Sequence, residues 1–134
     1  MTIIDDDMLA AVQEEAKESP RLRMNRNFHR SFEDKCQRFL NAMEPGTEIP
    51  VHRHPDKDET LVLLKGKVRV STYGDGGEML SSCVLGREEG RYGVDIPPNV
   101  WHGLECLEPS VLFECKPGPF VPRKAEEIFG RVGK

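Results

Sequence analysis

Four residues in two segments of the chain have the types and the spacing of metal ligands. His52 and His54 are separated by one residue, and Glu59 follows after the polar stretch 55–58. In an extended segment, side chains at positions i and i+2 point to the same side, so the two imidazoles are expected to project together. The turn residues that follow would bring Glu59 beside them on a neighbouring strand. Nitrogen and oxygen ligands of this kind suit Zn, Fe, Mn, Ni or Cu.

A third imidazole lies downstream in the segment DIPPNVWHGLEC, where His102 follows a Pro-Pro turn. The chain has four histidines in all, so three of them fall in these two segments. Each could be an ordinary residue of a strand edge or a turn if it stood alone. Their combination with a carboxylate predicts one divalent-metal site, formed by His52, His54, Glu59 and His102.

The spacing of these residues resembles the two sequence motifs of the cupin superfamily. The first motif is matched position for position by Gly46, His52, His54, Glu59 and Gly66. The second motif is matched at its proline and its histidine, Pro97 and His102. It departs from the pattern at three positions: Asn99 replaces the motif glycine, Cys106 replaces the final asparagine, and the leading glycine is displaced by one, at Gly90. Asparagine adopts the left-handed turn conformation more readily than most residues, so the turn should survive.

This resemblance implies an all-β fold: a small single-domain cupin, or double-stranded β-helix (jelly-roll-like barrel), with a short N-terminal helix and a short C-terminal helix. It also implies that the four ligands hold one divalent transition metal, Zn, Fe, Mn or Ni, and that the protein is a homodimer.

The chain also resembles the WbuC family of cupin-fold metalloproteins. The matching segments are SPRLRMNRNFH (residues 19–29), CQRFLNAMEPGTEIPVHRHPDKDET, IPPNVWH and LFECKPGPF. That resemblance implies a part in bacterial surface-polysaccharide (O-antigen) biosynthesis, without implying a reaction.

Length and charge limit the other possibilities. The 134 residues, with a formal net charge of -4, predict one domain (1–134) and argue against nucleic acid as a partner. No apolar run approaches the length of a membrane helix, and the acidic N-terminus lacks the pattern of a signal peptide, so we expect a cytoplasmic protein. The four cysteines show no CxxC pairing and are expected to be reduced.

Hydrophobic patterns predict the remaining elements. Residues 5–18 are expected to form a helix within an N-terminal part, 1–20, and residues 21–117 form the barrel. The segment 35–44 is a strand by the cupin resemblance. We expect hairpins about Lys65-Gly66-Lys67 and about Glu108-Pro109. The tail, 118–134, is expected to carry a helix at 124–131.

Residues 21–30 alternate between a polar and a mainly apolar face. The polar face could be the solvent side of an edge strand, or it could point into the barrel and bind an anionic or hydroxyl-rich small molecule such as a sugar. On the second interpretation the ligand-binding residues are Arg21, Arg23, Asn25 and Asn27.

Three hypotheses of function remain open. The first is a metal-dependent enzyme acting on a sugar or nucleotide-sugar, for example an isomerase or epimerase, with His29, Tyr73 and Glu114 as candidate acid-base groups. The second is a non-catalytic module that binds a metal-chelating small molecule. The third is an Fe(II) dioxygenase.

Overall fold

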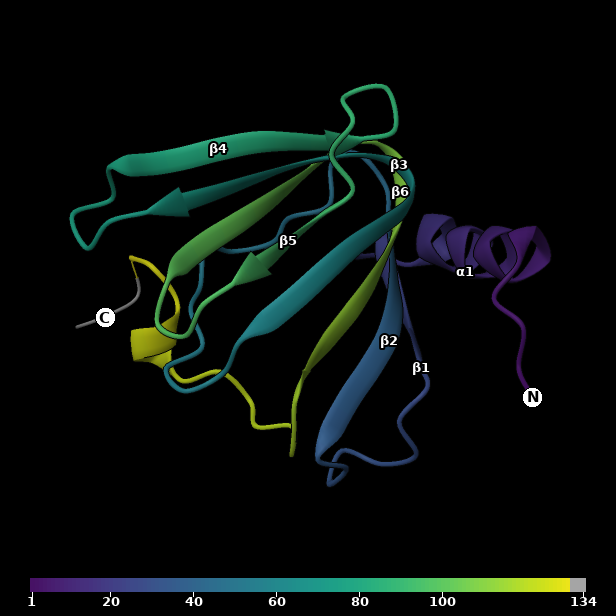
Figure 1. Ribbon diagram of the computed structural model, residues 1–134, viewed down its shortest axis with the longest axis horizontal. Helices are drawn as coiled ribbons and strands as arrows, with labels where there is room; N and C mark the ends of the chain where they lie inside the picture. Colours follow the sequence, from purple (N-terminus) through teal and green to yellow (C-terminus); the bar gives the residue numbers. More distant parts are fainter. Residues whose placement is uncertain (131–134) are drawn as a thin grey trace.

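The computed structural model describes residues 1–130, which form one strongly bent antiparallel sheet with a helix on its outer side (Figure 1). The expected all-β class is confirmed. The strand order is β1-β2-β6-β3-β4, and β5 pairs with β3. The elements are α1 (Asp6–Glu18), β1 (Arg23–Asn27), β2 (Cys36–Met43), β3 (Glu59–Tyr73), β4 (Met79–Gly86), β5 (Gly93–Ile96), β6 (Trp101–Pro117) and the 3-10 turn η1 (Ala125–Glu127).

The two long strands, β3 and β6, pair along nearly their whole length and bend together at their middle. The register of the ladder shifts between Leu63 and Val68, where Gly66 has a φ of 96°. A Cβ atom at Gly66 would meet the carbonyl oxygen of Pro109 and the side chain of Ser110. The Ser110 hydroxyl accepts a hydrogen bond from the backbone N–H of Lys67 at 3.0 Å. The bend therefore depends on a glycine on one strand facing a serine on the other.

The two hairpins expected about Gly66 and about Pro109 were wrong. Both sites are irregularities inside continuous strands, and the strands pair with each other instead of folding back on themselves. Glycine and proline mark a bulge in a sheet as readily as a reversal of the chain, because both disturb the ladder.

Two hydrophobic clusters hold the sheet. The first lies between the facing halves of the sheet and includes Met43, Leu61, Val68, Leu85 and Leu112. The second lies beneath α1, where Leu9, Val12 and Ala16 pack on Leu40, Ala42 and Val111. Neighbouring residues of β2 and β6 therefore point to opposite faces of the sheet, one packed against α1 and the other facing the interior.

Helix α1 occupies the predicted segment. Asp5 caps it by accepting a hydrogen bond from the backbone N–H of Met8 at 3.0 Å. No helix among residues 1–130 is both long enough and apolar enough to cross a membrane.

The expected C-terminal helix at 124–131 was wrong in extent. The described part holds only the 3-10 turn at Ala125–Glu127, and Arg131 lies outside the described residues. The tail is extended on either side of this turn because its backbone pairs with a distant segment. The N–H of Arg53 donates to the carbonyl of Glu127 at 3.0 Å, and the N–H of Phe129 donates to the carbonyl of Val51 at 2.8 Å.

The bend predicts that Gly66 tolerates no side chain. Gly66→Ala combines a left-handed backbone with overlap against backbone atoms of β6, and it should lower the free energy of unfolding by about 2–4 kcal/mol. Gly90→Ala is the matched control, because Gly90 also has a positive φ (68°) but open space around it. It should cost about 1 kcal/mol. Urea unfolding measures both, and equal losses would contradict the packing argument.

Candidate metal centre

The segment that carries His52 and His54 lies between the start of β6 and the C-terminal tail. The backbone N–H of His52 donates to the carbonyl of His102 at 3.0 Å, and the N–H of His102 donates to the carbonyl of His52 at 2.9 Å. On its other side, His52 forms a bridge with Ile128. The segment thus forms one isolated bridge with each of its two neighbours and is not a regular strand. Reciprocal bonding still places the His52 and His102 side chains next to each other.

The turn before β6 is tied to the same segment. Asn99 has a φ of 65°, the left-handed conformation expected for the residue that replaces the motif glycine. Its backbone N–H donates to the carbonyl of His54 at 2.7 Å. The turn therefore fixes the distance between the His54 and His102 backbones.

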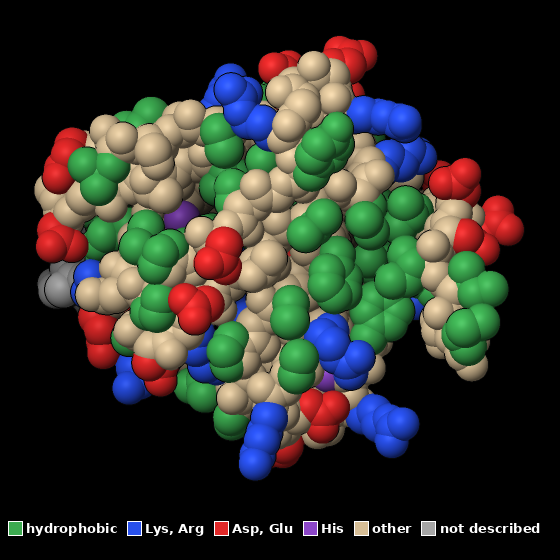
Figure 2. Space-filling model, viewed as in Figure 1, with side chains coloured by type: hydrophobic (Ala, Val, Ile, Leu, Met, Phe, Trp, Pro, Cys, Tyr) green, Lys and Arg blue, Asp and Glu red, His purple; other side chains and the backbone are tan. Residues whose placement is uncertain are grey.

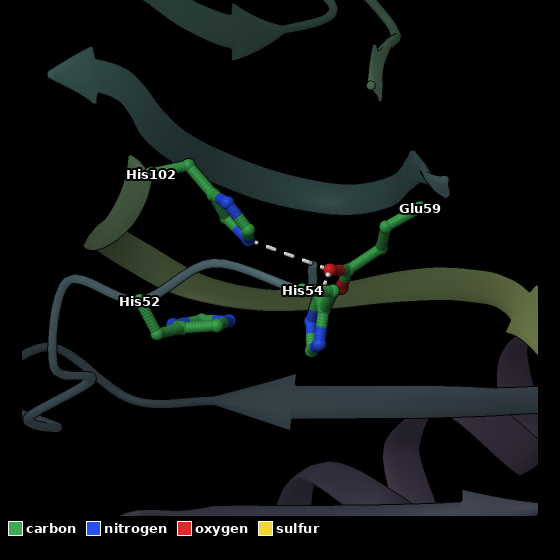
Figure 3. Close-up of side chains that lie close together, drawn as sticks. All are labelled: His52, His54, Glu59 and His102. Atoms are coloured by element: carbon green, nitrogen blue, oxygen red, sulfur yellow. Dashed lines mark ion pairs between the residues drawn. The ribbon is translucent and has the colours of Figure 1, made fainter. Parts of the chain in front are cut away.

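Figure 3 shows the four predicted side chains converging from the His52–His54 segment, β3 and β6. Their ligand atoms all lie within 4.8 Å of one another. Oε2 of Glu59 is 3.0 Å from Nε2 of His54 and 3.4 Å from Nε2 of His102. The structure thus brings together all four residues that the motif spacing singled out.

Backbone carbonyls orient two of the imidazoles. Nδ1 of His52 lies 2.8 Å from the carbonyl oxygen of Pro50, and Nδ1 of His102 lies 2.9 Å from that of Val100. A carbonyl only accepts, so Nδ1 carries the proton and Nε2 keeps a free lone pair. This is the tautomer that a metal-binding histidine needs.

Three atoms of the cluster are buried without a hydrogen-bond partner among the described residues: Nε2 of His54, Oε2 of Glu59 and Nε2 of His102. Buried polar atoms of folded proteins are nearly always paired, and a cluster of lone pairs facing one another is costly. A divalent cation would satisfy all three at once. The residues present therefore fit a metal ion with three nitrogen ligands and one oxygen ligand.

The protonation states are those of ligands. Burial lowers the pKa of His52 to about 3, helped by the positive charges of His102, when protonated, and Arg123. Burial alone would raise the pKa of Glu59, but the close approach of the His102 and His54 imidazoles, with the charge of Lys116 nearby, holds it well below its usual range. A neutral imidazole and an ionised carboxylate are the forms that bind metal.

The centre opens into a cavity of about 410 Å³. Of the residues predicted to bind a ligand, three line it and Asn27 does not. The lining residues are Arg21, Arg23, Asn25, Phe39, Asn41, Ile49, His52, His54, Glu59, Leu104, Glu114, Lys116, Phe120, Val121, Pro122 and Arg123.

The three candidate acid-base groups are separated by the fold. Glu114 lines the cavity and accepts a hydrogen bond from Nδ2 of Asn41 at 3.0 Å. His29 is buried away from it, where Nδ1 accepts from the backbone N–H of Arg38 at 3.0 Å. Tyr73, at the far end of β3, does not line it either.

Several lining residues were missed from the sequence. Asn41 and Lys116 occupy inward positions of β2 and β6, and alternation along those strands could have identified them. Arg123 and its neighbours in the tail could not be identified in this way, because the tail is held beside the cavity by pairing between residues 127–129 and the distant residues 51–53. No local pattern encodes that pairing.

Comparison with known proteins places the chain in a family. Residues 4–85 match the family described as "Domain of unknown function (DUF6016)". The chain belongs to this family. A search of curated proteins returned no match to this DUF6016 chain.

Solved structures show the same fold. The cupin domain of Cnp3 from Schizosaccharomyces pombe is 13% identical, with 71% of this chain and 64% of that chain covered and a TM-score of 0.57. KdgF from Halomonas sp. is 17% identical, with 81% and 86% covered and a TM-score of 0.56. The capsular polysaccharide assembling protein CapF from Staphylococcus aureus is 20% identical, with 74% and 28% covered and a TM-score of 0.57. The DUF6016 chain thus has a cupin fold and spans about a quarter of CapF.

The environment of Glu114 predicts a distinctive dependence of stability on pH. Burial, followed by the negative charge of Glu59, raises the pKa of Glu114 to about 7 from a usual value of 4.5. The folded state therefore keeps a proton that the unfolded state loses. The resulting stability is present below pH 4.5 and is lost as the pH rises through 7. Glu114→Gln keeps the group neutral, so at pH 8 the metal-free variant should be more stable than the parent by up to about 3 kcal/mol.

Urea unfolding of metal-free protein between pH 5 and 8 measures this difference. Glu48→Gln, at an exposed position outside the cavity, is the control and should leave the pH profile unchanged. Parallel profiles for Glu114→Gln and the parent would contradict the assignment of a buried, protonated Glu114.

Proposed function

We propose that this protein is a metal-dependent cupin that binds and acts on a sugar or nucleotide-sugar-type small molecule in bacterial surface-polysaccharide (O-antigen) biosynthesis. The observation that carries the proposal is the three-histidine, one-glutamate cluster opening into a cavity of about 410 Å³. A cavity of this size suits a small molecule. The resemblance to the WbuC family and the likeness to the polysaccharide-assembling protein CapF support the polysaccharide setting.

The residues around the cavity suit proton transfer. A divalent ion on the four ligands would supply a Lewis acid that polarises a carbonyl or alkoxide oxygen. Glu114 holds or releases a proton near neutral pH, because its pKa is raised to about 7 and Asn41 fixes its position. An isomerase or epimerase can use such a proton-transfer group together with a Lewis acid. In this proposal Arg21, Arg23 and Asn25 hold the ligand, and the protein works in the cytoplasm.

Metal analysis tests the proposal first. Protein purified without an affinity tag should contain about one equivalent of a transition metal. His52→Ala and His102→Ala should each lose most of it, because each removes one of four ligands. His29→Ala is the matched control, since it removes the histidine that lies outside the centre, and it should keep its metal.

The identity of the metal directs the next assay. Zinc, manganese or nickel supports Lewis-acid chemistry, whereas iron together with oxygen uptake would replace the proposal with a dioxygenase. Tight ligand binding without turnover would replace it with a binding module. Absence of metal after reconstitution with each ion would overturn the metalloprotein assignment.

We also propose that the protein is a homodimer that pairs through the outer face of β3. Val62, Leu64 and Tyr92 are exposed there by 37%, 42% and 61%, and Figure 2 shows hydrophobic side chains gathered over the middle of this face. Apolar surface of this kind marks contact sites. Leu64→Glu should convert the dimer to a monomer in sedimentation, whereas Leu80→Glu, at an exposed position of β4, should not. A monomeric parent protein would contradict this interface.

A further inference from the structure

The cavity beside the metal centre gathers positive charge from three separate segments. Arg23 begins β1 and Arg21 lies in the turn just before it, Lys116 comes from the end of β6, and Arg123 comes from the tail. No ion pair within 4.0 Å among residues 1–130 involves any of the four. Surface cations of this protein elsewhere do find carboxylates, as Arg69 does with Glu105 at 2.7 Å.

Of the four, only Arg23 has a buried nitrogen, Nε, without a hydrogen-bond partner among the described residues. Burial lowers the pKa of its guanidinium, and the charges of Arg21 and Arg123 lower it further, against a smaller opposing effect of Glu114. Arg23 therefore lies among like charges with a donor unsatisfied, an arrangement that costs free energy unless a ligand completes it.

The negative groups in the cavity do not balance this charge. Four cationic side chains face two carboxylates, Glu59 and Glu114. The Glu59 carboxylate points toward the imidazoles of His54 and His102 and not toward the four cations. The chain as a whole carries a formal net charge of -4, so the positive cavity is a local feature. A concave site of one sign draws ligands of the opposite sign.

We propose that Arg23 and Arg123 bind the carboxylate or phosphate group of a hydroxylated small molecule whose remaining oxygens face the metal centre. Guanidinium groups bind both oxyanions through paired N–H donors. Lys116 adds a third charge on the wall that Glu114 shares, and Phe120 and Val121 give the body of the ligand an apolar cover. The orientation toward the metal rests on the proposed function, whereas the oxyanion subsite does not.

Isothermal titration calorimetry at low ionic strength tests the subsite with two matched pairs of probes. Gluconate is compared with sorbitol, which has the same hydroxyl chain without the carboxylate, and glucose 6-phosphate is compared with glucose. At least one anion should bind ten-fold or more tightly than its neutral partner, and the tighter anion identifies carboxylate or phosphate as the natural group. Added salt should weaken that binding.

Arg23→Gln and Arg123→Gln should each weaken binding of the anion ten-fold or more and leave metal content unchanged. Arg87→Gln is the control, because Arg87 is an exposed cation outside the cavity and the change in net charge is the same. Equal affinity for charged and neutral probes, or unchanged affinity in both arginine variants, would overturn the subsite.

The titrations are repeated on metal-free protein, which separates the two proposals. Anion binding that persists without metal supports the subsite even where the metal assignment fails. A metal-loaded protein that binds neither anion retains the metal centre and overturns the subsite.

Discussion

The shared bend of β3 and β6 is the constraint on which the metal centre depends. Glu59 begins β3, and His102 pairs with Thr72 near the other end of the same strand. In a straight strand those positions would lie about 40 Å apart, yet the Glu59 carboxylate is 3.4 Å from the His102 imidazole. The sheet must fold over itself between them, and it does so where Gly66 faces Ser110. The site is therefore a product of sheet curvature, which neither strand possesses alone.

Most of the buried polar side-chain atoms that lack a hydrogen-bond partner among the described residues lie around the cavity and the metal centre. The core clusters are apolar and closely packed, and Ser110 makes hydrogen bonds within the bend. Around the cavity, Nε of Arg23, Oδ1 of Asn41 and Oε2 of Glu59 are buried without partners among the described residues. Each such group costs about 1–3 kcal/mol. These groups lower the free energy of unfolding in the region where we propose that a ligand binds, and functional sites commonly lower stability in this way.

Local spacing accounts for what could be predicted from the sequence. His52, His54 and Glu59 follow from an i, i+2 histidine pair and a turn, whereas His102 follows from its place after the Pro-Pro turn of the second motif. The left-handed backbone of Asn99 could be predicted because few residues adopt a positive φ. Helix α1 follows from its apolar stripe and its cap. The hairpins were misassigned for another reason: a glycine or a proline in the sequence indicates a chain reversal and a bulge equally well. Only the pairing of β3 with β6 distinguishes these, and that pairing is not encoded near either residue. The position of Arg123 beside the cavity could not be predicted for the same reason.

The pairing of the tail with the His52–His54 segment also has a consequence for the order of folding. Residues 127–129 hydrogen-bond to residues 51–53, which in turn bridge to His102. These contacts join parts of the chain that are synthesised far apart in time, and contacts of such sequence separation form slowly. During synthesis His52 and His54 emerge well before either of their backbone neighbours. The four ligands can meet only after His102 has been synthesised and β6 has paired with β3, so any ion held by all four is acquired after these two strands have paired.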